Sequence, residues 1–147
     1  MVLESMLGEV LARGALAIVA YAALGLVLLI VGFFAVDLAT PGRLSKIISV
    51  ERNPNATLIA TSGLVAIGLI VAASIYASGG TLLEGLLATL VFGLVGIIAQ
   101  TVAAFVFDKV LGFDLAGLIR NPELQPATRL LAATHVVLGI ITAVAVI

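Results

Sequence analysis

Residues 37–57, DLATPGRLSKIISVERNPNAT, form a polar and basic connector between two long apolar segments. Residues 108–128, DKVLGFDLAGLIRNPELQPAT, form a second connector between two more. The four apolar segments lie at about residues 14–36, 56–78, 82–107 and 127–147. Because about 20 apolar residues in a helix cross a bilayer core, each segment is long enough to span a membrane.

Composition agrees with this reading. Of 147 residues, 63% are hydrophobic and 10% are charged, against about 45–50% and about 25% in soluble domains. The sequence therefore predicts an all-α integral membrane protein with four transmembrane helices and one membrane domain, residues 1–147. The acidic N-terminal stretch is unlike the basic start of a signal peptide, so we expect the first segment to be retained.

The two halves of the chain align without a gap at an offset of about 71 residues. The matching pairs include Gly14/Gly85, Gly25/Gly96, Phe34/Phe105, Asp37/Asp108, Leu44/Leu115, Ile48/Ile119, Ala56/Ala127, Thr57/Thr128 and Gly68/Gly139. Since each half crosses the membrane twice, both halves point the same way. The sequence predicts a parallel tandem repeat of a two-helix hairpin, with units at residues 11–76 and 82–147.

Positive charge gathers on the connectors. The cations in or beside them are Arg43, Lys46, Arg52, Lys109, Arg120 and Arg129, whereas the opposite side carries only Arg13, together with Glu4, Glu9 and Glu84. By the positive-inside rule, both connectors are expected in the cytoplasm and both termini outside it. Arg13 and Glu84 occupy equivalent repeat positions with opposite charge, and we expect them to pair within the chain or between subunits.

Each connector is expected to contain a short amphipathic helix in the headgroup region. In the first, Thr40 is a suitable N-cap before Pro41; in the second, Asp114 can cap. The following spanning helices are expected to begin at Asn-Pro pairs, at residues 53–54 and 121–122, because Asn caps well and Pro is tolerated at the first helical position.

Two aspartates are candidate functional residues. Asp37 and Asp108 lie at equivalent helix ends, where the helix dipole already places partial negative charge. They should therefore have cationic partners, for which Arg43, Arg52, Lys109, Arg120 and Arg129 are within reach. One interpretation is that these pairs fix the connectors to the helix ends; the other is that they form an ion or ligand gate.

Gln100 and His135 are polar residues inside the third and fourth segments, where the first repeat unit has Leu29 and Leu64. Each could hydrogen-bond a neighbouring helix, or His135 could act as a proton-sensitive group. Ser62 lies at a similar depth to His135, which permits the idea of a hydrolytic pair. No G-x-S-x-G motif or oxyanion-stabilising group accompanies it, so this idea is weak. Ser62 fits close helix packing better, as do Gly63, Gly68, Gly93 and Gly96.

No motif indicates a cofactor, a metal site or nucleic-acid binding. The chain has no cysteine and one histidine, so neither a thiolate site nor a histidine cluster is available. An enzyme is not expected, because no nucleophile, base and stabilising group occur together.

The chain resembles the domain-of-unknown-function 350 family of small bacterial inner-membrane proteins. The resemblance covers nearly the whole chain and is carried by VDLATPGRL (36–44), ERNPNAT (51–57), SGLVAIGLIVAASI (62–75), FDKVLGFDLAGLI (107–119) and NPELQPAT (121–128). It implies a bacterial plasma-membrane protein with a link to envelope stress, and it names no catalytic residue.

Two functions remain open from the sequence. The first is a non-enzymatic oligomeric scaffold or sensor whose basic connectors touch anionic lipid or a cytoplasmic partner protein. The second is an oligomeric channel or small-solute pathway gated at Asp37 and Asp108, with Gln100 or His135 along it. A homo-oligomer is expected in either case, because one short chain can hardly enclose an aqueous pathway.

Overall fold

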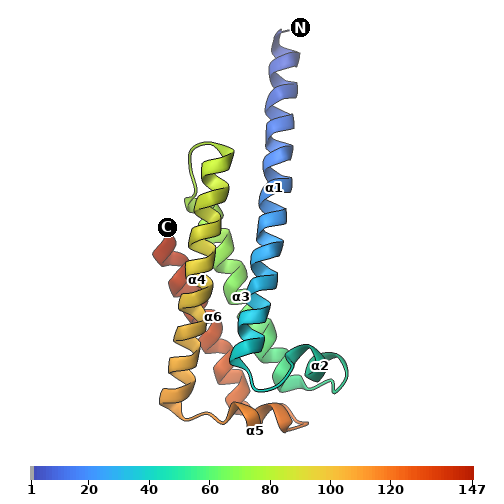
Figure 1. Ribbon diagram of the computed structural model, residues 1–147, viewed down its shortest axis with the longest axis vertical. Helices are drawn as coiled ribbons and strands as arrows, with labels where there is room; N and C mark the ends of the chain where they lie inside the picture. Colours follow the sequence, from blue (N-terminus) through green and yellow to red (C-terminus); the bar gives the residue numbers. More distant parts are fainter. Residues whose placement is uncertain (1) are drawn as a thin grey trace.

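A computed structural model describes the backbone of residues 2–147 and the side chains from residue 6 onward. All regular structure in these residues is helical. The helices are α1 (Val2–Ala39), α2 (Leu44–Ser49), α3 (Pro54–Ala77), α4 (Leu82–Leu111), α5 (Leu115–Arg120) and α6 (Pro126–Val146). Figure 1 shows the four long helices side by side, with α2 and α5 at one end, here named the connector end.

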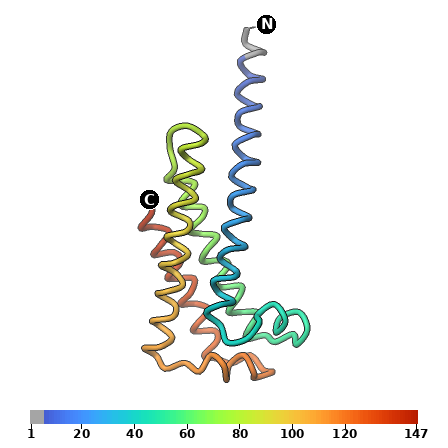
Figure 2. Tube along the Cα trace, viewed as in Figure 1, coloured from blue at the N-terminus to red at the C-terminus, as the bar shows by residue number. Residues whose placement is uncertain are grey.

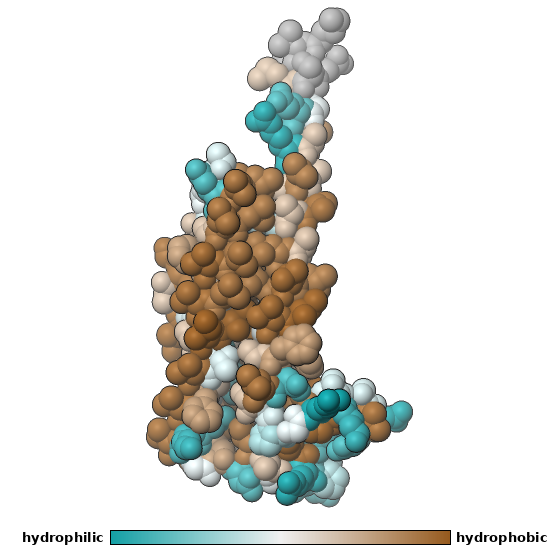
Figure 3. All heavy atoms as spheres, in the orientation of Figure 1, coloured by the Kyte–Doolittle hydropathy of each residue, from teal (hydrophilic) through white to brown (hydrophobic). Residues whose placement is uncertain are grey.

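The chain ends and the α3–α4 turn point away from the connector end, and α1 projects furthest (Figure 2). The four long helices have the length and hydropathy needed to cross a membrane, as the sequence predicts. An apolar belt covers the middle of the molecule, with polar residues gathered at the connector end (Figure 3). This distribution is that of a helical membrane protein, because the apolar belt can face lipid only if every backbone group is satisfied inside a helix.

Two helices run beyond their expected limits. The predicted first segment starts near residue 14, whereas α1 already begins at Val2. Glu9 and Arg13, one helical turn apart, form an exposed ion pair of 2.6 Å on this extension, which favours helix outside the apolar belt. Within the chain, Arg13 therefore does not pair with Glu84, whose carboxylate instead accepts from the backbone N–H of Thr81, the N-cap of α4. Pairing of the two residues between subunits stays a prediction.

Helix α4 continues to Leu111 and stops at Gly112, which adopts the left-handed conformation at φ 68°. Glycine suits this position because it has no Cβ to clash.

Helix α3 lies at the centre of the bundle and packs most extensively against α6. In its spanning window 56% of the residues are buried, against 11% for α1. The two helices touch at Gly139, where an added Cβ would lie 2.6 Å from the Cα of Ala66. The expected packing glycines Gly63, Gly93 and Gly96 also face neighbouring side chains closely. Gly68 does not, since nothing lies within 4 Å of its Cβ position.

The short helices turn their apolar sides onto the bundle. Leu44 of α2 and Ile119 of α5 are 0% and 5% exposed, and they share a core cluster with Ile59 and Leu131. The expectation that these sides rest on lipid is therefore wrong for Leu44 and Ile119, because the ends of α3 and α6 offer a protein surface at the same place.

Helix α2 begins later than predicted. Its N-cap is Arg43 rather than Thr40, and the N–H of Leu44 donates to Asp37 Oδ1 at 2.6 Å. The hydroxyl of Thr40 instead donates to the carbonyl of Val36. For α5 the predicted cap is confirmed, since Asp114 accepts from the N–H of Gly117.

Helix α3 begins as predicted, because the side chain of its N-cap, Asn53, accepts hydrogen bonds from the backbone N–H groups of Asn55 and Ala56. The predicted start of α6 at residues 121–122 is wrong: Asn121 ends α5, and α6 begins at Pro126. The reason is that Asn55, which belongs to α3, makes hydrogen bonds to the segment between α5 and α6 and to the first turn of α6. Its Oδ1 accepts from Gln125 N at 2.8 Å and from Thr128 Oγ1 at 2.7 Å.

The amide nitrogen of Asn55 completes this arrangement by donating to the carbonyls of Asn121 and Glu123, at 3.0 and 2.8 Å. Asn53 adds donations to the carbonyls of Ile119 and Asn121. The start of α3 thus holds residues 119–128 of the second connector, and Asn55 is fully buried with all four of its hydrogen bonds made.

Candidate functional site

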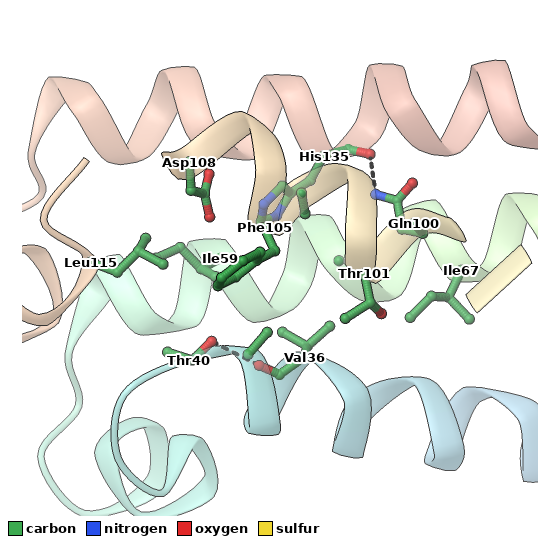
Figure 4. A pocket seen from close by; sticks show the side chains of 13 residues that line it. Val36, Thr40, Ile59, Ile67, Gln100, Thr101, Phe105, Asp108, Leu115 and His135 are labelled. Carbon is green, nitrogen blue, oxygen red and sulfur yellow. Dashed lines mark hydrogen bonds between the residues drawn. The ribbon is translucent and has the colours of Figure 1, made fainter. Parts of the chain in front are cut away.

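A small cavity lies between the four long helices, toward the connector end. Its volume is about 40 Å³, enough for one or a few water-sized molecules. Most of its wall is apolar, and its polar side chains are Thr40, Gln100, Thr101, Asp108 and His135. We name this space the polar cavity. Figure 4 shows Asp108, His135 and Gln100 following one another along the bundle, across from Val36 of α1 and from Thr40, which follows α1.

The cavity is closed on the side away from the connectors. Four apolar residues, here named the apolar plug, form a core cluster there: Leu28, Ile67, Val71 and Ile97, each at most 5% exposed. Ile67 also lines the cavity. On the connector side the cavity shares Ala39, Phe105, Asp108 and Leu115 with an open groove. It also shares Ala39, Thr101 and Phe105 with an apolar groove between α1 and α4. The polar cavity therefore adjoins grooves on two sides, and Asp108 lies on the connector side.

Gln100 joins α4 to α6. Its amide nitrogen donates to the backbone carbonyl of His135 at 2.8 Å. This bond sets the orientation of the amide, since the flipped amide would place oxygen against oxygen. The side chain is 4% exposed, and its Oε1 is buried without a hydrogen-bond partner.

His135 is 7% exposed and lies 3.4 Å from Ser62 through Nδ1. The hydroxyl of Ser62 donates to the carbonyl of Ile59 at 2.9 Å, so its only hydrogen is already used. We therefore assign the imidazole proton to Nδ1, donating to Ser62 Oγ, which leaves Nε2 as an acceptor. Nε2 is buried with no partner. In this arrangement His135 is not placed to take a proton from Ser62, as a hydrolytic pair would require.

Asp108 is half-buried, and its Oδ1 has no partner. Neither Asp108 nor Asp37 makes an ion pair in the part of the chain whose side chains are described. The expected Asp–Arg pairs are therefore not formed. The physical reason differs between the two. Asp37 accepts from the backbone N–H of Leu44, the first residue of α2. Lys109, beside Asp108, places its ammonium group 5.5 Å from the centre of the Phe105 ring.

Three connector cations come together elsewhere. Arg43, Lys46 and Arg120 line an open groove of about 470 Å³ between α2 and α5, together with Glu51. We name it the basic groove. Arg52 and Arg129 are exposed and do not line it. Arg52 has a positive φ of 52°, in the left-handed region that non-glycine residues rarely adopt.

The sequence indicated Gln100, His135 and Asp108 individually, and the fold brings all three to one cavity. It did not indicate Thr40 and Thr101 as lining residues, because threonines in apolar helices commonly bond their own backbone. No group of three or more metal-ligating side chains occurs within the described residues.

Four helices of membrane-spanning length around a small polar cavity define a multi-pass membrane protein. The chain belongs to the family described as Domain of Unknown Function (DUF350), whose model matches residues 9–146. The predicted family resemblance is thereby confirmed.

Relatives of the chain include three mycobacterial transmembrane proteins. The chain is 34% identical to a UPF0719 transmembrane protein of Mycolicibacterium paratuberculosis over 134 residues, covering 91% of this chain and 89% of that protein. It is also 34% identical to UPF0719 transmembrane proteins of Mycobacterium bovis and Mycobacterium tuberculosis, over 78% of this chain and 76% of each relative. No solved structure matches the chain significantly.

Proposed function

We propose that this protein is a non-enzymatic sensor of the bacterial plasma membrane, which takes a small polar ligand into the polar cavity and reports its presence through the connectors. The observation that carries the proposal is the apolar plug, which separates the cavity from the far end of the bundle. A pathway for conduction needs two openings, whereas the apolar plug of Leu28, Ile67, Val71 and Ile97 closes one side. The link to envelope stress rests on the family resemblance.

The connectors can respond to the cavity because they share residues with it. Leu115, the first residue of α5, lines the cavity directly. Thr40 lines it from the segment that leads into α2. A ligand that shifts either residue would also shift the walls of the basic groove, which α2 and α5 share.

The connectors would report through the basic groove, a positively charged surface that can bind negatively charged groups. Arg43, Lys46 and Arg120 outnumber Glu51 around the basic groove. Basic residues near a membrane surface attract anionic lipid with about 1 kcal/mol each. Anionic headgroups or an acidic partner protein are thus the expected contacts of the connectors.

Measuring the contact between the connectors and anionic lipid tests this function. Purified protein in nanodiscs with increasing anionic lipid is compared with R43E/K46E, using energy transfer to a labelled anionic lipid. We expect weaker lipid contact in R43E/K46E and no change in R13E, whose cation lies at the other end. Unchanged contact in R43E/K46E would refute the role of the groove.

A channel is the second candidate, and one observation favours it. Gln100 and His135 face the cavity and are 4% and 7% exposed, rather than facing lipid. Opening of the apolar plug would join the cavity to the far side. Proteoliposomes with the wild type, D37N and D108N test this: flux above empty liposomes that changes in D108N would establish a channel and overturn the sensor.

Orientation and assembly complete the proposal. The connectors carry most of the cations, which supports a cytoplasmic connector end with both termini outside. The order of a long, a short and a long helix occurs twice, which supports the tandem repeat. The small buried share of α1, 11%, supports contacts with further copies of the chain. Since the chain has no cysteine, S45C and G79C labelled from each side of the membrane would test orientation.

A further inference from the structure

The basic groove has cations on two walls that come from different connectors. One wall carries Arg43, the N-cap of α2, and Lys46 of the same helix. The other wall carries Arg120, the last residue of α5. A ligand that binds all three cations must therefore reach from one connector to the other.

These three cations have no anionic partner among the side chains that the structure describes. None of them forms an ion pair, even with Glu51, which lines the same groove. Three cations against one carboxylate leave two positive charges. Because a cleft lined by charge of one sign concentrates counter-ions, the groove is complementary to a ligand with two negative charges.

The rest of the groove is largely apolar. Pro41, Ile47, Ala116 and Ile119 also line it. Its volume of about 470 Å³ lies in the range of sites for small organic molecules, about 300–1,000 Å³. Such a lining suits a ligand whose anionic groups are joined by hydrocarbon better than it suits a small inorganic anion.

The groove lies next to the apolar belt, because the polar connector end adjoins that belt (Figure 3). Leu38, near the end of α1, is 89% exposed, and Pro41 of the groove follows three residues later. Val50 is 69% exposed and directly precedes Glu51. Exposed apolar side chains beside cations are typical of the membrane interface. A ligand in the groove would thus have its anionic groups at headgroup level and hydrocarbon beside Leu38 and Val50.

We infer that the basic groove binds a phospholipid whose headgroup contains two phosphates, one at each wall. Cardiolipin, in which glycerol joins two phosphates, has this chemistry. The inference rests on the proposed function in taking the groove as the surface that meets anionic groups. Arginine binds phosphate through two parallel hydrogen bonds, and basic pockets between membrane helices bind such headgroups. A lipid with one phosphate reaches one wall only.

Each chain has one such site among the residues described. At the offset of 71 residues, Arg43 matches Asp114 and Lys46 matches Gly117. Asp114 lines a separate groove together with Asp108. The second connector therefore lacks the basic wall of the first, and we expect one two-phosphate lipid per chain.

The first test is native mass spectrometry of the full chain, released from detergent and titrated with cardiolipin or with phosphatidylglycerol at equal phosphate. We expect one cardiolipin per chain, bound about tenfold tighter or more, because the second phosphate binds at a high effective concentration. Equal affinity for the two lipids would overturn the inference. Pyrophosphate serves as a headgroup without acyl chains. If it displaced cardiolipin at equal concentration, the site would belong to a soluble diphosphate rather than to a lipid.

The second test compares variants that keep their helix content by circular dichroism. R120Q removes one basic wall and R43Q/K46Q removes the other. Each should weaken cardiolipin binding about tenfold and abolish the preference over phosphatidylglycerol. R120K, which keeps the charge, should retain part of the preference.

R129Q is the matched control, since it removes an exposed cation of the connector end that does not line the groove. It should keep the preference for cardiolipin. A preference that survives in both R120Q and R43Q/K46Q, or that R129Q abolishes equally, would overturn the inference.

The lipid-contact assay separates this inference from the proposed function. Equal binding of the two lipids, with weaker lipid contact in R43E/K46E, would leave the function standing and remove the two-phosphate headgroup. Unchanged lipid contact in R43E/K46E would remove both.

Discussion

Asn55→Leu is the substitution that should most clearly separate tertiary structure from local sequence preference. Asn55 is 0% exposed and is the N2 residue of α3. Its side chain makes four hydrogen bonds, three to the segment between α5 and α6 and one to Thr128 in the first turn of α6. Leucine has a similar volume, so the substitution removes the hydrogen bonds and leaves little empty space.

The size of the effect depends on which hydrogen bonds each partner of Asn55 can still make after the substitution. The N–H of Gln125 loses its partner, at a cost of about 1–3 kcal/mol for a buried donor. The hydroxyl of Thr128 can turn to a carbonyl of its own helix, which limits its loss. The carbonyls of Asn121 and Glu123 keep Asn53 and the Gln125 side chain as donors. We therefore expect a loss of about 3 kcal/mol in the free energy of unfolding.

Reversible unfolding by SDS in mixed micelles, followed by circular dichroism, measures this loss. Asn121→Leu is the matched control, because the Asn121 side chain only accepts from the exposed N–H of Glu123. It should cost no more than about 1 kcal/mol. If Asn55→Leu costs less than about 1 kcal/mol, or the same as Asn121→Leu, then Asn55 does not hold the second connector and the reasoning fails.

Three further predictions use the same unfolding assay. Gly139→Ala should lower the free energy of unfolding by about 1–3 kcal/mol, since the added Cβ would lie 2.6 Å from Ala66 Cα. Gly68→Ala is the control: nothing lies near its Cβ position, so it should be neutral or stabilising by up to about 1 kcal/mol. Equal effects of the two substitutions would contradict this prediction. Gly112→Ala should cost about 1 kcal/mol at its φ of 68°, and Gly112→Asn should cost less, because asparagine tolerates this conformation. Thr81→Ala should cost about 1 kcal/mol by removing the capping box of α4, and Thr81→Ser should restore it; failure of serine to do so would argue against the cap.

The sequence predicted best where local chemistry decides. Asn53 before Pro54 starts α3, and Asp114 caps α5, because a capping side chain reaches only its own next turn. Prediction was wrong where a distant residue competes. Asn121 before Pro122 has the same local signal as Asn53 before Pro54, yet Asn55 of α3 sets the start of α6 at Pro126 instead.

The candidate site shows the same division. Gln100 and His135 stood out because they replace leucines of the first repeat unit, and polar groups in apolar segments are costly. Their joint cavity with Asp108 was not predictable, because it depends on how α4 and α6 rotate about their axes against α3. Asp37 and Asp108 look equivalent in the sequence. Asp37 accepts from the N–H of Leu44 at the start of α2, whereas Asp108 Oδ1 has no hydrogen-bond partner and its side chain lines the cavity.

The sequence by itself determined that this chain spans a membrane with four helices joined by basic connectors, because hydrophobic length and charge are properties of each segment alone. Only the tertiary structure decided which polar atoms meet, which remain unpaired, and that the apolar plug closes one side of their cavity. These features depend on contacts between helices far apart in the chain, such as Gly139 against Ala66, and no local pattern records them.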